Sequence, residues 1–253
     1  MLSQPLFEQL KNLRCPGMLE ALQEQLAQPG CNELSFEERL SLLLEREYIL
    51  RENRKLSTRL RKAKLKVQAC AEDIDYQASR GLSKSVIKKL IDCSWIDRKQ
   101  NLLLTGPTGT GKTWLACALA NQACRRGFSA LYLRLPRLFQ MLELAKGDGT
   151  FPKLFASIAK TQLLVLDDWG LTPMNEMHKR DLLEIMDDRH NQSSTIITSQ
   201  IPVSLWHETI NDLTLADAIL DRLIHNAHRI ELHGESMRKE YAGKMDGQAT
   251  FFL

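Results

Sequence analysis

The eight residues from Gly106 to Thr113 constrain the fold of this chain more than any other stretch. They read Gly-Pro-Thr-Gly-Thr-Gly-Lys-Thr and fit the pattern G-x-x-x-x-G-K-[ST], whose backbone N–H groups bind phosphate oxygens. The apolar run at 101–105 predicts a buried parallel strand, and the Ala- and Leu-rich run at 114–120 predicts a helix. A strand, a phosphate-binding loop and a helix in this order predict an α/β fold that binds a nucleoside triphosphate.

Each part of this loop has a defined task at a bound triphosphate. The residues expected to contact the nucleotide are Gly106, Pro107, Thr108, Gly109, Thr110, Gly111, Lys112 and Thr113. The helix that starts here adds partial positive charge at its N-terminus. We expect Lys112 to reach the β- and γ-phosphates as a catalytic residue, and the Thr113 hydroxyl to ligate Mg²⁺. The alternative is an ordinary glycine-rich turn between a strand and a helix.

A second signal is the apolar run at 163–166, which two carboxylates follow. The run predicts a buried strand, with Asp167 and Asp168 at its carboxyl end. This is the Walker B pattern, in which Asp167 holds the Mg²⁺ shell. Asp168 stands where a general base polarises the attacking water, and it is one methylene shorter than Glu, which predicts slow turnover. The alternative is an acidic turn after a core strand.

The β-branched run at 194–200 predicts another strand, with Thr198 and Ser199 near its carboxyl end. In a parallel sheet this end lies beside the nucleotide, so these hydroxyls can sense the γ-phosphate or orient water. The alternative is a pair of polar residues at a strand exit. Further strands at 130–133 and 229–232, with helices between them, predict a parallel sheet sandwiched by helices. Little sequence follows the last strand, so we expect a C-terminal lid to be reduced or absent.

Residues 1–70 predict a small all-helical domain for partner or DNA interaction, and 71–253 the ATPase domain. Pro16-Gly17 separates two helices, and Ser35 with Glu38 forms a capping box that opens a third. The third helix becomes basic, because eight Lys or Arg and one acidic residue occupy 51–66. Such a run can follow DNA phosphates. A solvated helix face or a linker is an equal alternative, because aromatic residues are missing here.

Composition excludes several classes of protein. Lys and Arg exceed Asp and Glu by only three, so net charge alone does not indicate a nucleic-acid partner. None of the six cysteines stands in C-x-x-C spacing, which gives no signal for zinc or a redox pair. We expect free thiols in a reducing cytoplasm. The N-terminus does not resemble a signal peptide, and no apolar run approaches the length of a membrane span.

Two further sets of residues carry less specific expectations. Trp95 and Ile96 precede the first strand, where P-loop proteins often contact the adenine base; an ordinary core role is the alternative. Lys146, Lys153 and Lys160 lie between the second strand and the Walker B strand, and the family resemblance described next implies that they are candidate DNA contacts.

Five segments, in this order, resemble one known family. They are Gly-Pro-Thr-Gly-Thr-Gly-Lys-Thr, Leu-Leu-Val-Leu-Asp-Asp-Trp-Gly, Thr-Ile-Ile-Thr-Ser-Gln, Ala-Ile-Leu-Asp-Arg-Leu and Gly-Glu-Ser-Met-Arg. With the Trp206 region they are similar to the IstB-like helper ATPases of insertion sequences, a branch of the AAA+ initiator clade. The match covers most of 80–240. It implies an AAA+ type of P-loop fold, the cofactors ATP and Mg²⁺, and slow ATP hydrolysis that assembly or DNA stimulates.

The resemblance also implies partners and two further site residues. The partners are double-stranded DNA, an IstA-like insertion-sequence transposase and further copies of the chain in an AAA+ homo-oligomer. Such proteins assemble on DNA with ATP, remodel it, and recruit and stimulate the transposase. By position, Thr198 and Ser199 look like the sensor-one site. Arg222 looks like the arginine finger that reaches the ATP of a neighbouring subunit, and Arg238 like a sensor-two relic; for Arg222 a surface helix arginine is the alternative.

Two other functions compete with a transposition helper. The first is a replicative helicase loader of the DnaC type, which the same segments resemble less closely. The second is a metabolic P-loop kinase, which needs a phosphoryl-acceptor site and an arginine-rich lid, and the sequence indicates neither.

Overall fold

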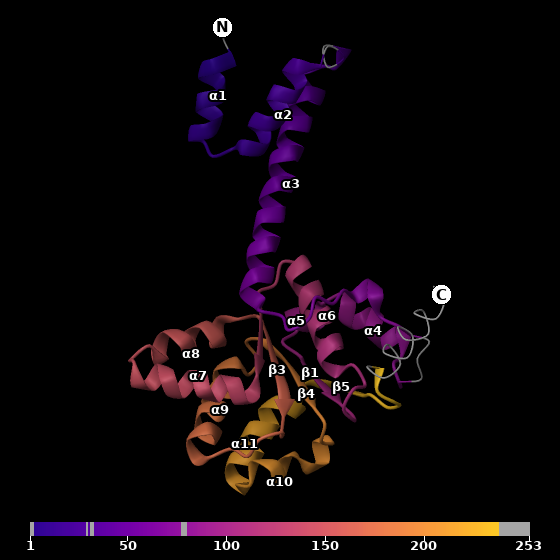
Figure 1. The fold of residues 1–253 in the computed structure, drawn as a ribbon, viewed down its shortest axis with the longest axis vertical. Coiled ribbons are helices and arrows are strands. Elements are labelled where there is room, and N and C mark those ends of the chain that lie inside the picture. Colours follow the sequence, from indigo (N-terminus) through magenta and orange to yellow (C-terminus); the bar gives the residue numbers. More distant parts are fainter. Residues whose placement is uncertain (1–2, 29, 31–32, 77–79, 238–253) are drawn as a thin grey trace, which may run out of the picture. The chain divides into compact units, whose positions relative to one another are not determined.

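Three helices form the N-terminal part of the chain in the computed structural model, which describes residues 3–28, 30, 33–76 and 80–237 (Figure 1). They are α1 (Ser3–Asn12), α2 (Pro16–Ala27) and α3 (Phe36–Ala63). Pro16 opens α2 because its fixed φ suits the first helical turn. The predicted capping box opens α3: the Ser35 N–H donates to Glu38 Oε2 at 2.8 Å, and the Glu38 N–H donates to Ser35 Oγ at 3.2 Å.

A buried carboxylate joins α2 to α3. Glu47 Oε2 accepts from the backbone N–H of Gly17 at 2.7 Å and of Met18 at 3.2 Å, while Oε1 accepts from Arg51 Nε at 2.6 Å. Burial acts to raise the pKa of Glu47, but the hydrogen bonds from Arg51 and the two N–H groups outweigh it, and the pKa is lowered. A Cβ at Gly17 would lie 2.8 Å from the Glu47 Cα, so only glycine fits at this crossing.

The chain divides into two compact units, residues 1–58 and 59–253, and the division falls inside α3. The last turn of α3 packs in the second unit, where Ala63 is fully buried and Arg59 Nε donates to the Cys124 carbonyl at 2.8 Å. The predicted boundary between residues 70 and 71 lies within this second unit. Half of the basic run therefore belongs to the same unit as the phosphate-binding loop.

Five parallel strands form the sheet of the second unit, as predicted. They are β1 (Asn101–Thr105), β2 (Ala130–Arg134), β3 (Leu163–Trp169), β4 (Ser194–Ser199) and β5 (Ala227–Glu231), in the order β2-β3-β4-β1-β5. Leu104 pairs with Thr198, and Arg134 pairs with Asp167. Because all strands are parallel, the ends of β2, β3 and β4 meet beside the loop that follows β1.

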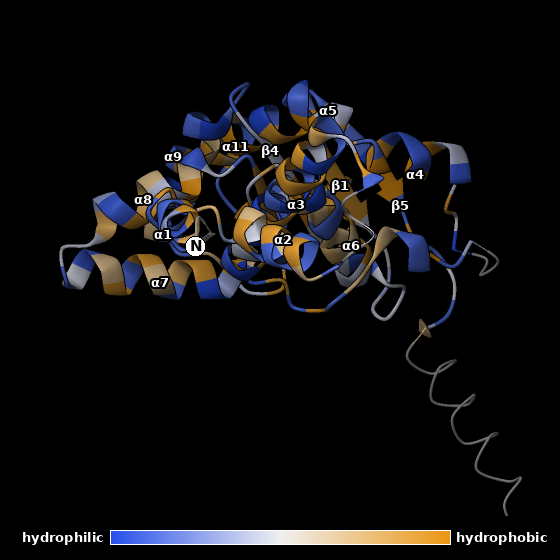
Figure 2. Ribbon diagram, turned by 90° about the horizontal axis from the view of Figure 1, so that it is seen from above, coloured by the Kyte–Doolittle hydropathy of each residue, from blue (hydrophilic) through white to orange (hydrophobic). Residues whose placement is uncertain are grey.

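Helices cover both faces of this sheet, as predicted (Figure 1). They are α4 (Lys84–Ile91), α5 (Ser94–Asp97), α6 (Lys112–Arg125), α7 (Leu135–Gly147), α8 (Phe151–Lys160), α9 (Glu176–Arg189), α10 (Trp206–Ile210) and α11 (Leu213–Ile224). Alternate strand residues such as Leu164, Leu166 and Ile197 join the core cluster with α7 to α11, and α6 packs on β1 to β4. Figure 2 colours the interior strand β1 as hydrophobic, whereas the helices around it carry hydrophilic turns.

The sequence did not predict α10, whose formation depends on tertiary contacts. Trp206 is fully buried, its ring packs 4.9 Å from that of Trp169, and its Nε1 donates to the Ile201 carbonyl at 3.0 Å. α11 ends at Ile224, and the chain turns before Ala227 enters β5. None of the helices in the described part of the chain is long and apolar enough to cross a membrane.

Candidate functional site

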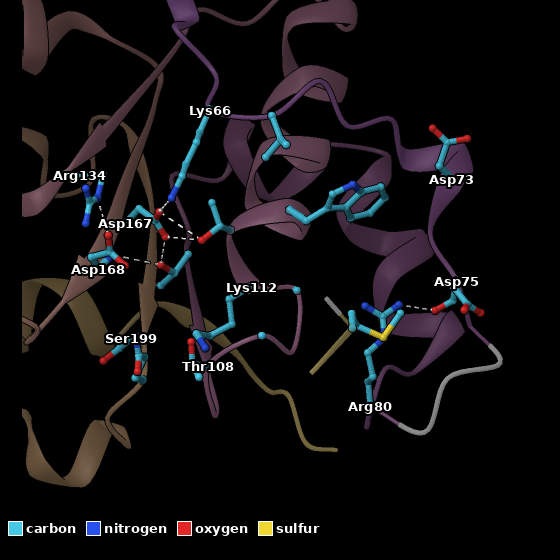
Figure 3. Close-up of a pocket in the computed structure, with 18 residues that line it drawn as sticks. Lys66, Asp73, Asp75, Arg80, Thr108, Lys112, Arg134, Asp167, Asp168 and Ser199 are labelled. Atoms are coloured by element: carbon cyan, nitrogen blue, oxygen red, sulfur yellow. Dashed lines mark hydrogen bonds and ion pairs between the residues drawn. The ribbon is translucent and has the colours of Figure 1, made fainter. Parts of the chain in front are cut away.

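A cavity of about 750 Å³ lies at the carboxyl edge of the sheet (Figure 3). Its walls come from the Gly106–Thr113 loop, the ends of β2, β3 and β4, the start of α6 and the chain before α4. The charged residues that line it are Lys66, Asp73, Asp75, Arg80, Lys112, Arg134, Asp167 and Asp168. The sequence motifs that were predicted to act together therefore meet in one place.

The loop itself is a close-packed backbone cradle. Gly106 has φ 136°, and a Cβ there would lie 2.0 Å from the Leu232 carbonyl oxygen. Gly109 has φ 85°, and its Cβ would lie 2.2 Å from Ser236 Oγ. Both positions therefore require glycine. Lys112 Nζ donates to the carbonyls of Gly106 and Pro107, each at 2.6 Å, so the ammonium lies over the loop.

Asp167 is the centre of the polar groups in the cavity. Its carboxylate is fully buried and accepts from the Thr113 hydroxyl, at 2.9 Å from Oδ1 and 3.1 Å from Oδ2. The hydroxyls of Tyr132 and Thr198, on the two neighbouring strands, also donate to it. Burial and the adjacent carboxylate raise the pKa of Tyr132, so its hydroxyl keeps its proton and remains a donor.

Asp168 reaches the same cavity because β3 is irregular at this point. Successive strand residues normally face opposite sides of a sheet. Here the register with β4 shifts between Leu166 and Trp169, and Asp168 has φ 65°, which turns its side chain into the cavity. Arg134 Nε donates to Asp168 Oδ2 at 2.6 Å, and this hydrogen bond raises the pKa of Arg134.

Thr198 and Ser199 both line the cavity, but their hydroxyls have different partners. The Thr198 hydroxyl donates to Asp167 and accepts from the Asp168 N–H at 3.3 Å. Ser199 Oγ donates to the Trp169 carbonyl at 3.0 Å and accepts from the Ile201 N–H at 3.0 Å. Thr198 is thus directly bonded to the carboxylate at the centre of the site, whereas Ser199 fixes the strand ends around it.

Arg222 does not line this cavity. Its Nε donates to Asp187 Oδ1 at 2.7 Å, and its Nη1 donates to the Ala218 carbonyl at 2.8 Å. Asn101, at the opposite end of β1 from the loop, donates through Nδ2 to the Arg222 carbonyl at 3.2 Å. Arg222 is therefore bonded at the end of the sheet away from the cavity. Arg238 lies outside the described residues.

The less specific expectations have mixed outcomes. Trp95 and Ile96 are buried and do not line the cavity, and Trp95 Nε1 donates to the Leu90 carbonyl at 3.0 Å, so they have the core role. Lys146 is held in the fold, because its Nζ lies 2.6 Å from Asp181 Oδ1. Lys153 and Lys160 are exposed.

Sequence reasoning missed Tyr132, Arg134, Lys66 and Arg80. Tyr132 and Arg134 alternate along β2, and only the strand order places that strand beside Asp167 and Asp168. Arg80 is 7% exposed, and its Nε has no hydrogen-bond partner among the described residues. A Cβ on Gly111 would lie 2.9 Å from Arg80 Nη1. A guanidinium that contacts the loop through Nη1 and has an unsatisfied Nε fits a cavity that receives an anionic ligand.

The donor set also fits Mg²⁺. The Thr113 hydroxyl and the Asp167 carboxylate are oxygen donors, which this cation prefers, and Mg²⁺ commonly uses one or two carboxylates together with substrate phosphates and water. The described residues contain no cluster of three or more His, Cys, Asp or Glu that could hold a metal ion.

Comparison with known families identifies the class of protein. Residues 8–244 match the family model described as IstB-like ATP binding protein. The chain belongs to this family. An insertion sequence ATP-binding protein of Sinorhizobium fredii, y4pL, is 52% identical over 244 residues, which cover 96% of this chain and all of that protein. The IS1162 ATP-binding protein of Pseudomonas fluorescens is 50% identical over 205 residues, covering 81% and 89% of the two chains.

Solved structures agree with the fold of this IstB-like chain. DnaI matches with a TM-score of 0.57 at 24% identity, over 66% of this chain and 92% of that one. DnaA bound to AMPPCP and single-stranded DNA also has a TM-score of 0.57, at 16% identity, over 75% of this chain and 58% of that one. The predicted AAA+ type of P-loop fold is thereby confirmed, and the relatives are ATP-binding proteins of insertion sequences.

Proposed function

We propose that this IstB-like chain is an ATP-dependent, DNA-binding AAA+ regulator of DNA transposition that hydrolyses ATP slowly. The observation that carries the proposal is the meeting of the phosphate-binding loop, the Thr113–Asp167 pair and Asp168 in one cavity, in a chain from a family of insertion-sequence ATP-binding proteins. In P-loop enzymes the phosphate-binding loop, the Mg²⁺ ligands and the catalytic carboxylate all act on the same bound triphosphate.

In this proposal the residues around the cavity have separate roles in ATP hydrolysis. Residues 106–113 would hold the phosphates, with Lys112 on the β- and γ-phosphates. Thr113 and Asp167 would hold Mg²⁺, which would supply positive charge to neutralise the charge of the phosphates. Asp168 takes the proton of the attacking water. Arg134 holds one oxygen of this carboxylate at 2.6 Å, which limits the freedom of Asp168 to turn toward the water and is one reason for slow turnover. Thr198, with Ser199 beside it, senses the γ-phosphate.

Assembly completes the site. Arg222 is the arginine finger in this proposal, and it acts on the ATP of a neighbouring copy because it does not face the cavity of its own chain. A guanidinium supplied across an interface stabilises transition-state charge only in the oligomer, so ATP hydrolysis and assembly become linked.

Double-stranded DNA is the proposed macromolecular ligand, and the basic run at 51–66 its contact surface. Arg54, Arg61 and Lys62 are exposed on α3. Arg59 instead donates to the Cys124 carbonyl and anchors the helix, so a test of DNA binding should leave it unchanged. Replacing Arg61 and Lys62 with Ala should weaken DNA binding and lower its salt dependence by about one to two units in the logarithmic slope. An unchanged slope would remove the run from the DNA contact.

Electron microscopy of the protein with a non-hydrolysable ATP analogue and duplex DNA tests the mechanism as a whole. We expect large homo-oligomers on DNA with wild type and none with Lys112→Ala. A chain that remains monomeric in every nucleotide state would refute assembly-dependent action.

The partner is proposed to be an insertion-sequence transposase of the IstA type, which the assembly recruits and stimulates. Capture of the ATP-loaded protein on immobilised transposase, compared with immobilised replicative helicase, separates this function from the alternative of a helicase loader. Retention by the helicase alone would favour the loader.

A further inference from the structure

Lys66 is a charged residue of the cavity that belongs to none of the ATPase motifs. It follows α3 in the chain, lines the cavity, and places its Nζ 3.8 Å from Asp167 Oδ2 (Figure 3). We infer that Lys66 contacts the terminal phosphate of a bound triphosphate and distinguishes ATP from ADP. This inference rests on the proposed use of the cavity for ATP.

The backbone on both sides of Lys66 is fixed against α6, the helix that starts in the phosphate-binding loop. Lys64 has φ 50°, which ends α3 and turns the chain. Ala63 and Ala69 are buried on either side of the turn. Farther along, Arg125 Nη1 of α6 donates to Glu72 Oε1 at 2.7 Å. The Lys66 side chain therefore starts from a defined place, although 44% of it is exposed and its four-carbon stem can move.

The position of the ammonium corresponds to the γ-phosphate end of the site. Thr113 and Asp167 mark the Mg²⁺ position, and this cation bridges β- and γ-phosphate oxygens in P-loop enzymes. A group within 4 Å of Asp167 is thus near the last phosphate rather than near the base. In Figure 3, Lys66 reaches toward Asp167, the Lys112 side chain points toward Thr108 in the loop, and Arg80 lies toward the other end of the cavity.

The charges around Lys66 predict how its side chain moves when nucleotide binds. In this structure the Lys66 ammonium faces the buried Asp167 carboxylate. A divalent cation held at Asp167 repels an ammonium at this distance, and the γ-phosphate oxygens attract it. Lys66 therefore turns from Asp167 to the γ-phosphate when Mg²⁺ and ATP bind. ADP lacks that phosphate, so Lys66 gains no such contact with ADP.

Calorimetric titration of the full chain with ADP and with a non-hydrolysable ATP analogue, both with Mg²⁺, tests this role. We expect Lys66→Met to bind the analogue about tenfold more weakly than wild type, as the loss of one charged contact implies. Its affinity for ADP should stay unchanged, and Lys66→Arg should retain most of the preference. Lys88→Met, on the exposed face of α4, removes the same charge away from the cavity and should bind both nucleotides as wild type does.

Two results would overturn the inference. Equal weakening for ADP and the analogue would mean that Lys66 only supports the general shape of the site, and unchanged binding of both would make it only a counter-ion of Asp167. Lys66→Gln provides a second neutral variant, and thermal unfolding checks that each variant is folded. If wild type itself binds neither nucleotide, the proposed function fails, and that failure is distinct from a failure of Lys66 alone.

Discussion

Replacing Tyr132 with Phe removes one hydroxyl from the centre of the site and keeps the ring that packs in the core. The Tyr132 side chain is buried, and its hydroxyl donates to the fully buried Asp167 carboxylate. A hydrogen bond to a charged group contributes about 1.5–3 kcal/mol to stability. A unit of this size loses roughly 2–4 °C in melting temperature for each kcal/mol, so we expect a decrease of roughly 3–12 °C.

Circular dichroism during thermal unfolding measures this effect. Tyr48→Phe is the matched control, because Tyr48 is 67% exposed on α3, and its melting temperature should equal that of wild type. If Tyr132→Phe unfolds at the same temperature as Tyr48→Phe, the hydroxyl does not stabilise Asp167 and our description of the site is wrong.

The same variant should also need more Mg²⁺. Groups that orient a metal-binding carboxylate typically change metal affinity by roughly 10–100-fold when removed. The Mg²⁺ concentration that half-saturates binding of an ATP analogue should therefore increase in Tyr132→Phe and stay constant in Tyr48→Phe.

Three further predictions concern Asp168, Arg222 and Glu47. Asp168→Asn should keep ATP affinity and lose hydrolysis by at least about 100-fold, measured as phosphate release, because a neutral amide cannot take the water proton. Arg222→Ala should keep ATP binding but lose DNA-stimulated hydrolysis; full stimulation would show that it is only a surface arginine bonded to Asp187. The pKa of Glu47 is lowered below 4.5 in the folded chain, so its stabilisation is present above that pH and lost as the pH falls through the folded pKa. Wild type should therefore be more stable than Glu47→Gln at neutral pH, and the difference in melting temperature should shrink in acid.

The motifs of the sequence predicted the parts of the site that depend on local chain order. Gly106 to Thr113 and the pair Asp167 and Asp168 carry their chemistry in neighbouring residues, and the structure brings them together. Four of the five strands were also predictable as short apolar or β-branched runs, and β5, with the sequence Ala-His-Arg-Ile-Glu, followed from its place after the last helix.

The remaining parts depend on tertiary arrangement. Tyr132 and Arg134 reach Asp167 and Asp168 only because β2 pairs with β3, and no local pattern gives that pairing. In the sequence, Lys66 is only one base of the run at 51–66. The packing of its segment on α6 places it in the cavity, and the sequence does not predict that packing. The turn at Asp168 required a shift in strand register, which alternation in the sequence does not predict.

The Trp169–Trp206 pair gives the protein an internal optical probe. Trp169 directly follows Asp168, and its ring lies 4.9 Å from that of Trp206, the first residue of α10. The Trp169 Nε1 has no hydrogen-bond partner among the described residues. The fluorescence emission of Trp169 should therefore respond to small shifts at the end of β3. With Trp95 and Trp114 replaced by Phe, fluorescence would follow events at the nucleotide cavity without an added label, at a point in the fold close to the helices that lead to Arg222.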